Sequence, residues 1–77
     1  MPCRVGITTD PHTRKAYWES QVVGFGGWRI LGSYNSKKGA QDHETRYAKK
    51  YRCQAHAGGA QATGKWYVYR FNYKREE

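Results

Sequence analysis

Residues 5–14 read VGITTDPHTR, and this stretch predicts the first two elements of the fold. At its start, apolar side chains alternate with small or polar ones, which is the period-two pattern of a β-strand. Asp10-Pro11 then predicts the start of a helix, because Asp can cap a helix and Pro is favoured at the first helical position. We therefore expect a strand over residues 1–8 and a helix from Pro11 to about Val22.

The middle of the chain repeats this order of strand and helix. Residues 28–34, WRILGSY, predict a second strand whose side chains Trp28, Ile30 and Tyr34 point to one side. The Asn-Ser pair that follows is typical of a turn and of a helix cap. The second helix is expected over residues 37–51.

The strongest strand signal is KWYVYRFNY at residues 65–73, which is dense in β-favouring side chains. A loop of small residues is expected over residues 55–64, and the charged tail, residues 74–77, is expected to fray. The pattern predicts an α/β (α+β) fold of β-α-β-α-β order, with residues 1–77 as one small domain. We expect a mainly antiparallel three-stranded sheet with two helices, in which the last strand pairs with the first.

The chain is strongly basic. Its 77 residues include 14 Lys and Arg against 6 Asp and Glu, which gives a formal net charge of +8. Such a charge on so small a domain is typical of a protein that binds nucleic acid, and we expect DNA as the first partner and RNA as the second. A generally basic surface without such a partner is the alternative. No apolar run of about 18 residues is present, so no membrane partner is expected.

Cys3 and Cys53 are the only cysteines, and no apolar signal segment is visible at the N-terminus. Two cysteines in a chain without a secretion signal indicate reduced thiols and no disulfide framework. The spacing of Cys53 and His56 offers one ligand pair, whereas a structural zinc site usually needs two. The sequence therefore predicts a cytoplasmic protein with two thiols.

Two charged side chains fall on helix faces that are otherwise apolar. Glu44 lies within the apolar stripe of the second helix, and Arg14 lies one turn before Trp18 on the first. A buried carboxylate is costly unless it is paired, hydrogen-bonded or bound to a metal. A structural salt bridge for Glu44 and a cation–π contact between Arg14 and Trp18 are the plain interpretations. The functional interpretation is that both side chains line one cleft at the sheet.

The last predicted strand carries aromatic side chains on alternate positions. Its aromatic face consists of Tyr67, Tyr69, Phe71 and Tyr73. Such a face can stack on nucleic-acid bases. A chain of this size needs large rings in its core, so core packing is the favoured interpretation.

Two stretches resemble the GIY-YIG nuclease superfamily: RVGITTDPHTR at residues 4–14 and WRILGSYNSKKGAQDHETRYAKKY at residues 28–51. In that family a motif strand is followed by Thr, by Asp-Pro or a similar pair, and by a helix arginine, and a later helix carries a glutamate. The resemblance implies cleavage of DNA with a divalent metal, Mg²⁺ or Mn²⁺. It implies Arg14 as the arginine that stabilises the phosphate and Glu44 as the metal ligand.

The chain departs from this family at its tyrosines. Arg4 stands where the second motif has its tyrosine, and the strand of the first motif has no counterpart ahead of it. A C-terminal strand that lies antiparallel beside the first strand would bring Tyr67 or Tyr69 to the cleft, in a permuted version of the fold. The catalytic residues that the resemblance implies are therefore Arg14, Glu44, Tyr67 and Tyr69, with Glu44 as the metal ligand.

Two functions remain open at this point. The first is a metal-dependent DNA endonuclease, which needs a carboxylate for the cation and a cationic group for the phosphate. The second is a non-catalytic DNA- or RNA-binding module on the same scaffold. Its phosphate contacts are expected from Arg4, Arg14, Arg29, Lys49 and Lys50. A small protein-interaction module is a third alternative.

Overall fold

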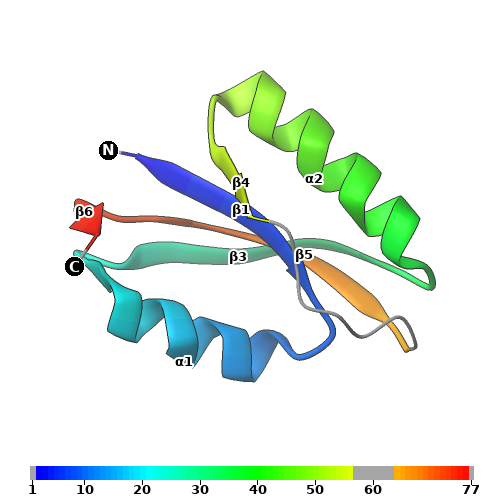
Figure 1. Ribbon diagram of the computed structural model, residues 1–77, viewed down its shortest axis with the longest axis horizontal. Coiled ribbons are helices and arrows are strands. Elements are labelled where there is room, and N and C mark those ends of the chain that lie inside the picture. Colours follow the sequence, from blue (N-terminus) through cyan, green and yellow to red (C-terminus); the bar gives the residue numbers. More distant parts are fainter. Residues whose placement is uncertain (1, 57–63, 77) are drawn as a thin grey trace.

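A four-stranded sheet organises the protein (Figure 1). The structure is a computed structural model, and it describes residues 2–56 and 64–76. The strand order is β3-β5-β1-β4. The strands are β1 (Cys3–Thr8), β3 (Gly26–Tyr34), β4 (Gln54–His56) and β5 (Trp66–Asn72). The loop expected over residues 55–64 falls mostly outside the described residues.

Strand β5 is antiparallel to both of its neighbours, β1 and β3. The predicted pairing of the last strand with the first is confirmed: Gly6 lies opposite Tyr69, and Thr8 opposite Tyr67. The mixed α+β class with a mainly antiparallel sheet is also confirmed. The main sheet has one strand more than expected, because β4 adds a short parallel strand at the outer side of β1. Its three residues carry no strand pattern of their own, so only tertiary pairing reveals it.

The two helices begin at the predicted caps. Helix α1 (Pro11–Gln21) starts after Asp10, whose side chain accepts a hydrogen bond from the Thr13 backbone N–H at 3.2 Å. Helix α2 (Lys37–Tyr51) starts after Ser36, whose hydroxyl accepts from a backbone N–H one turn later. Helix α2 has the predicted bounds, and α1 ends one residue early.

The residues after α1 become extended. Val22 and Val23 form β2, which pairs with β6 (Arg75–Glu76). The tail that was expected to fray therefore continues as a strand as far as the structure describes it. An ion pair between Arg4 and Glu76 adds a second contact between the tail and the sheet.

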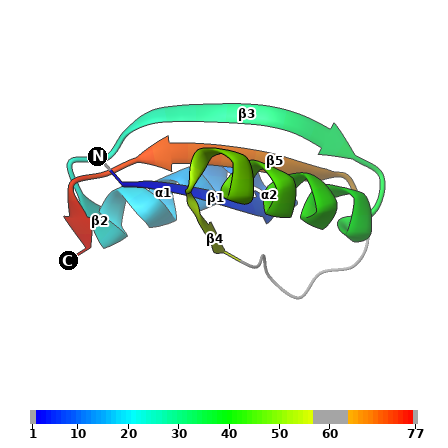
Figure 2. The ribbon, with the colours of Figure 1, turned by 90° about the horizontal axis from the view of Figure 1, so that it is seen from above.

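The helices cover opposite faces of the sheet (Figure 2). Two buried clusters show this division. The α2-side cluster comprises Val5, Ile7, Ala40, Cys53, Trp66 and Val68. The α1-side cluster comprises Trp18, Val22, Tyr69, Phe71 and Tyr73. The aromatic face of β5 is thus largely core, as the sequence predicted, and it faces α1.

The side chains at even-numbered positions of β3 project to one face of the sheet in its first half and to the other face in its second half. Ile30 pairs with Tyr69, but the next pair is Gly32 with Val68, so one extra residue is inserted in β3. Such a bulge shifts the alternation of side chains by one position. Trp28 consequently packs with the α1-side cluster, and Tyr34 packs with the α2-side cluster. The expectation that Trp28, Ile30 and Tyr34 point to one side is therefore wrong.

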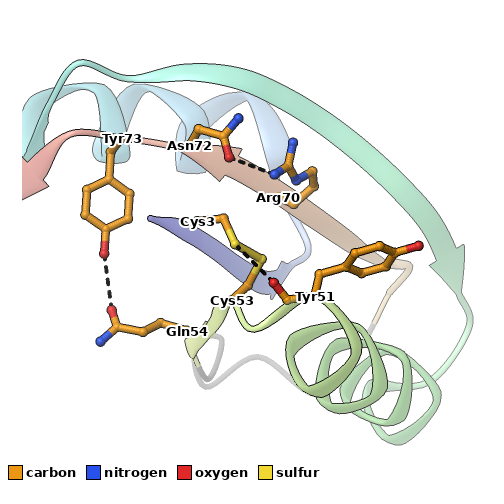
Figure 3. Close-up of a disulfide and its surroundings, with 7 residues drawn as sticks. All are labelled: Cys3, Tyr51, Cys53, Gln54, Arg70, Asn72 and Tyr73. Atoms are coloured by element: carbon orange, nitrogen blue, oxygen red, sulfur yellow. Dashed lines mark hydrogen bonds between the residues drawn. A yellow bond between two sulfur atoms is a disulfide. The ribbon is translucent and has the colours of Figure 1, made fainter. Parts of the chain in front are cut away.

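Cys3 and Cys53 form a disulfide (Figure 3). The parallel pairing of β1 with β4 places Arg4 beside Gln54, so the preceding cysteines also meet, with their Cα atoms 4.8 Å apart. The expectation of two reduced thiols is therefore wrong. A spacing of 50 residues gives no sign of this contact in the sequence. The Cys3 sulfur also lies 4.0 Å from the Tyr51 carbonyl oxygen, a contact without a shared proton because a disulfide sulfur carries none.

Candidate nucleic-acid interface

Arg14 and Glu44 belong to helices on opposite sides of the sheet. Arg14 lies on α1, half-buried, with its guanidinium carbon 5.5 Å from the centre of the Tyr17 ring. Glu44 lies on α2, and only Glu44 and Ala40 are buried on that helix. The sheet lies between these two helices (Figure 2), and the charges of Arg14 and Glu44 both act on the Tyr69 side chain, in opposite directions. The ring beside Arg14 is Tyr17, whereas Trp18 was expected.

Glu44 is buried, as its place in the apolar stripe predicted, with 4% of its surface exposed. Within residues 2–56 and 64–76, no group of three or more His, Cys, Asp or Glu side chains lies together. Mg²⁺ usually keeps several waters when a protein binds it. The packed position of Glu44 between α2 and the sheet does not fit such a hydrated ion.

Tyr67 and Tyr69 lie on the α1 side, as the pairing of β5 with β1 requires. Tyr69 is fully buried, and its hydroxyl accepts a hydrogen bond from the Trp18 indole N–H at 2.9 Å. Burial raises the pKa of Tyr69 above its usual value, while the Trp18 hydrogen bond and the charge of Arg14 act in the opposite direction. The charge of Glu44 raises the pKa of Tyr69 further. A buried phenol of this kind stays protonated at neutral pH and is poorly placed to activate water.

The five cations expected at phosphates have different surroundings. Arg4 is held inside the protein: it pairs with Glu76, and its guanidinium carbon lies 4.9 Å from the Trp18 ring centre and 5.4 Å from that of Tyr73. Arg14 is also partly covered. The three exposed members of the set are Arg29, Lys49 and Lys50. These three are the ones that solvent, and hence a phosphate, can reach.

A groove of about 260 Å³ runs along one flank of α2. We call it the α2 groove, and its lining residues are His43, Arg46, Tyr47, Lys50 and Tyr51. These positions recur every three or four residues, so they share one side of the helix. Cations and aromatic rings therefore alternate along the same surface. Lys49 is exposed as well, but it lies outside this lining.

Two arginines of the sheet lie on the same side as the α2 groove. Arg29 of β3 pairs directly with Arg70 of β5, and Arg70 pairs in turn with Val5 of the α2-side cluster. Residues that oppose each other in a sheet project to the same face. One amino group of Arg70 donates a hydrogen bond to the side-chain oxygen of Asn72 at 2.7 Å (Figure 3). The guanidinium groups of β3 and β5 thus extend the basic surface of α2 onto the sheet.

His43 sits where α2 meets β3. Its Nδ1 atom is 2.8 Å from the Tyr34 hydroxyl oxygen, and its ring edge packs over Gly32. Partial burial lowers the pKa of His43, and the nearby charge of Arg46 lowers it further. His43 is therefore a neutral member of the groove at neutral pH and becomes a cation when the pH falls.

The sequence identified Lys50 and Arg29 in this interface but missed Arg46, Tyr51 and Arg70. The i, i+4 spacing of Arg46 and Lys50, with Tyr47 and Tyr51 beside them, was a signal that the sequence already contained. The position of Arg70 has no such signal, because it depends on the pairing of β3 with β5.

Comparison with protein-family models, with curated proteins and with solved structures returns no match to the chain. The resemblance to GIY-YIG nucleases therefore rests on the two quoted stretches alone. In the residues that the structure describes, no helix is long and apolar enough to cross a membrane.

Proposed function

We propose that the chain is a nucleic-acid-binding domain that holds a sugar–phosphate backbone at the α2 groove and the neighbouring arginines of the sheet. The observation that carries this proposal is the groove itself, in which Arg46 and Lys50 alternate with Tyr47 and Tyr51. Cations that neutralise phosphates supply most of the affinity in such complexes. Aromatic rings beside them are typical of surfaces that contact bases.

The cross-strand pair of arginines supports the same proposal. Arg29 and Arg70 oppose each other directly, and like charges in this relation destabilise a sheet. A phosphate bound between the two guanidinium groups would relieve that repulsion, since guanidinium matches a phosphate with paired hydrogen bonds. An anionic partner would therefore stabilise this pair of arginines more than it would stabilise an isolated arginine.

The test is binding of a fluorescent DNA or RNA oligonucleotide as a function of salt concentration. With about four phosphate contacts, the log–log slope of affinity against salt is expected to be about −3 to −4. The Lys50→Ala variant should weaken binding and reduce the slope by about one. Lys49→Ala is the matched control, because Lys49 is the adjacent exposed lysine outside the groove, and it should change both quantities less. Affinity that does not vary with salt would count against the proposal.

Metal-dependent cleavage of DNA is a second candidate, and the pairing of β5 with β1 favours it. Tyr69 lies opposite Gly6 and Tyr67 opposite Thr8, and both tyrosines project to the face of the sheet that α1 covers, where a permuted GIY-YIG site would need them. The buried position of Glu44 on the other face counts against it, because the metal ligand would have to become accessible.

Cleavage of plasmid DNA with Mg²⁺ or Mn²⁺ separates the two candidates. A nuclease should lose cleavage in the Glu44→Gln variant and still bind DNA. Asp42→Asn, a change of an exposed carboxylate on the same helix, is the control and should keep cleavage. Failure of the unmodified protein to cut with either metal rejects the nuclease candidate and leaves the binding proposal in place.

We propose a cytoplasmic location, as expected from the sequence, on the condition that the disulfide is reduced there. Disulfides persist in oxidising compartments and are rare in the cytosol. A cytosolic form of the protein would therefore hold Cys3 and Cys53 as thiols. Labelling of free thiols in protein isolated under acid quench decides between the two states.

A further inference from the structure

Tyr51 exposes its ring at the end of the α2 groove. Of its surface, 53% is accessible to solvent, the largest fraction among the exposed large hydrophobic side chains of the described residues. The centre of its ring is 4.4 Å from that of Tyr47, with the two planes inclined by 38°. The Lys50 ammonium nitrogen lies 5.4 Å from the same ring. The Tyr51 ring thus contacts a second, tilted ring, and the Lys50 ammonium, at the end of a flexible side chain, lies over it.

We propose that Tyr51 stacks on an unpaired base, so that the α2 groove selects single-stranded over double-stranded nucleic acid. This inference rests on the proposed function, and it names the form of nucleic acid that the same surface binds. Stacking on an aromatic ring requires a base whose flat face is accessible. In a duplex those faces are covered by the neighbouring base pairs, so only the phosphates of a duplex can use this groove.

The order of groups along the groove suits this mode of binding. Arg46 and Lys50 are one helical turn apart, as are Tyr47 and Tyr51, so a row of cations lies beside a row of rings. A single strand presents the same two rows, since its phosphates lie along one side and its bases along the other. Arg29 and Arg70 lie on the same side of the sheet and can hold the strand where it leaves the helix.

A purely structural role does not account for the exposure of Tyr51. The buried aromatic rings of this protein are enclosed in the clusters on either side of the sheet, whereas Tyr51 belongs to neither cluster. In Figure 3 its ring extends from the last turn of α2, away from the disulfide. Removal of the ring is therefore expected to leave the fold intact, which makes Tyr51 a suitable position to test.

The experiment measures fluorescence anisotropy of a labelled oligothymidine of roughly 12 nucleotides and of the same strand in a duplex with oligoadenine. The unmodified protein should bind the single strand more tightly. Tyr51→Ala should weaken single-strand binding by between about 5- and 100-fold, which corresponds to one stacked base, and should leave duplex binding within about twofold. Tyr51→Phe keeps a ring and should bind like the unmodified protein.

Tyr17→Ala is the matched control. Tyr17 is also exposed, at 44%, and also has a cation above its ring, but it lies on α1 at the other face of the sheet. This variant should bind both oligonucleotides as before. An abasic oligonucleotide of the same length removes the bases instead of the ring, so it tests the proposal with the unmodified protein. It should bind that protein as weakly as oligothymidine binds Tyr51→Ala.

The outcomes separate this inference from the proposed function. If no oligonucleotide binds with salt dependence, the proposed function fails and the inference fails with it. If binding is salt-dependent but equal for single strand, duplex and abasic strand, the inference is overturned and the proposed function stands. Equal weakening of duplex and single-strand binding by Tyr51→Ala also overturns it, because a stacked base cannot explain that result.

Discussion

The Trp18 indole donates a hydrogen bond to the Tyr69 hydroxyl at 2.9 Å, and this bond joins helix α1 to the strand that lies between β1 and β3. Both residues are buried in the α1-side cluster. A hydrogen bond inside such a cluster fixes the position of the helix relative to the sheet, because apolar contacts alone are less directional. Tyr69 therefore has a structural role that is independent of any chemistry.

Tyr69→Phe removes this hydrogen bond and keeps the ring. We expect the free energy of unfolding to fall by about 0.5–1.5 kcal/mol, the usual net value of one hydrogen bond. Urea denaturation followed by Trp fluorescence measures it. Tyr17→Phe is the control, since Tyr17 is exposed, and it should leave the stability unchanged. Stability of Tyr69→Phe equal to that of the unmodified protein would show that the bond contributes nothing.

Gly6→Ala tests how closely Tyr69 approaches β1. A methyl group at Gly6 would overlap the ring and hydroxyl of Tyr69, which lie directly over the glycine. We expect a loss of about 1–3 kcal/mol, typical of an overpacked core. Gly26→Ala is the matched control, because a methyl group there meets no other atom within 4 Å. Equal stability of the two variants would contradict the close approach.

The fold was predictable where its signals are local. Asp10-Pro11 and Ser36 mark helix starts through capping, and capping depends on neighbours within one turn. The disulfide and β4 were missed because each depends on the parallel pairing of two segments about 50 residues apart. The bulge in β3 was missed for a related reason, since its register is fixed by β5 and by no residue of β3 alone.

The candidate site was predictable only in part. The burial of Glu44 followed from helix periodicity, which is a local property. The place of Glu44 relative to Arg14 was not predictable, because periodicity gives the inward side of each helix but not the face of the sheet that the helix covers. Arg4 looked available for phosphate in the sequence and is instead enclosed by Trp18 and Tyr73. The enclosure of Arg4 could not be predicted from the sequence, because it depends on tertiary contacts.

Reduction of the disulfide should destabilise the protein strongly. Cys3 and Cys53 close a loop with a sequence separation of 50, and the chain-entropy estimate for a loop of this size is about 4 kcal/mol. For a domain this small, each 1 kcal/mol shifts the melting temperature by about 4–8 °C. Thermal melts with and without a reductant measure the change. The Cys3→Ser/Cys53→Ser double variant should melt at the temperature of the reduced protein and should no longer respond to the reductant.

Acidification should weaken folding and strengthen binding, and His43 links the two effects. Its pKa is lowered in the folded protein by burial and by Arg46, so the folded state favours the neutral ring. The unfolded chain therefore binds the proton more readily, and the contribution of His43 to stability is present above its unfolded pKa of 6.5 and is lost as the pH falls through the folded value. The affinity for nucleic acid should change in the opposite direction and rise as the pH falls, because a protonated His43 adds a cation to the α2 groove.

The measurement compares stability and oligothymidine affinity between about pH 7.5 and about pH 5.5, the range in which histidine titrates. The unmodified protein should lose stability and gain affinity as the pH falls, and His43→Gln should reduce both changes. His12→Gln is the control, because His12 is exposed on the other face of the sheet, on α1, and should leave both changes in place. If His43→Gln and His12→Gln keep the same pH dependence as the unmodified protein, His43 does not control either equilibrium. If only the stability change disappears, His43 supports the fold but its charge does not reach the bound phosphates.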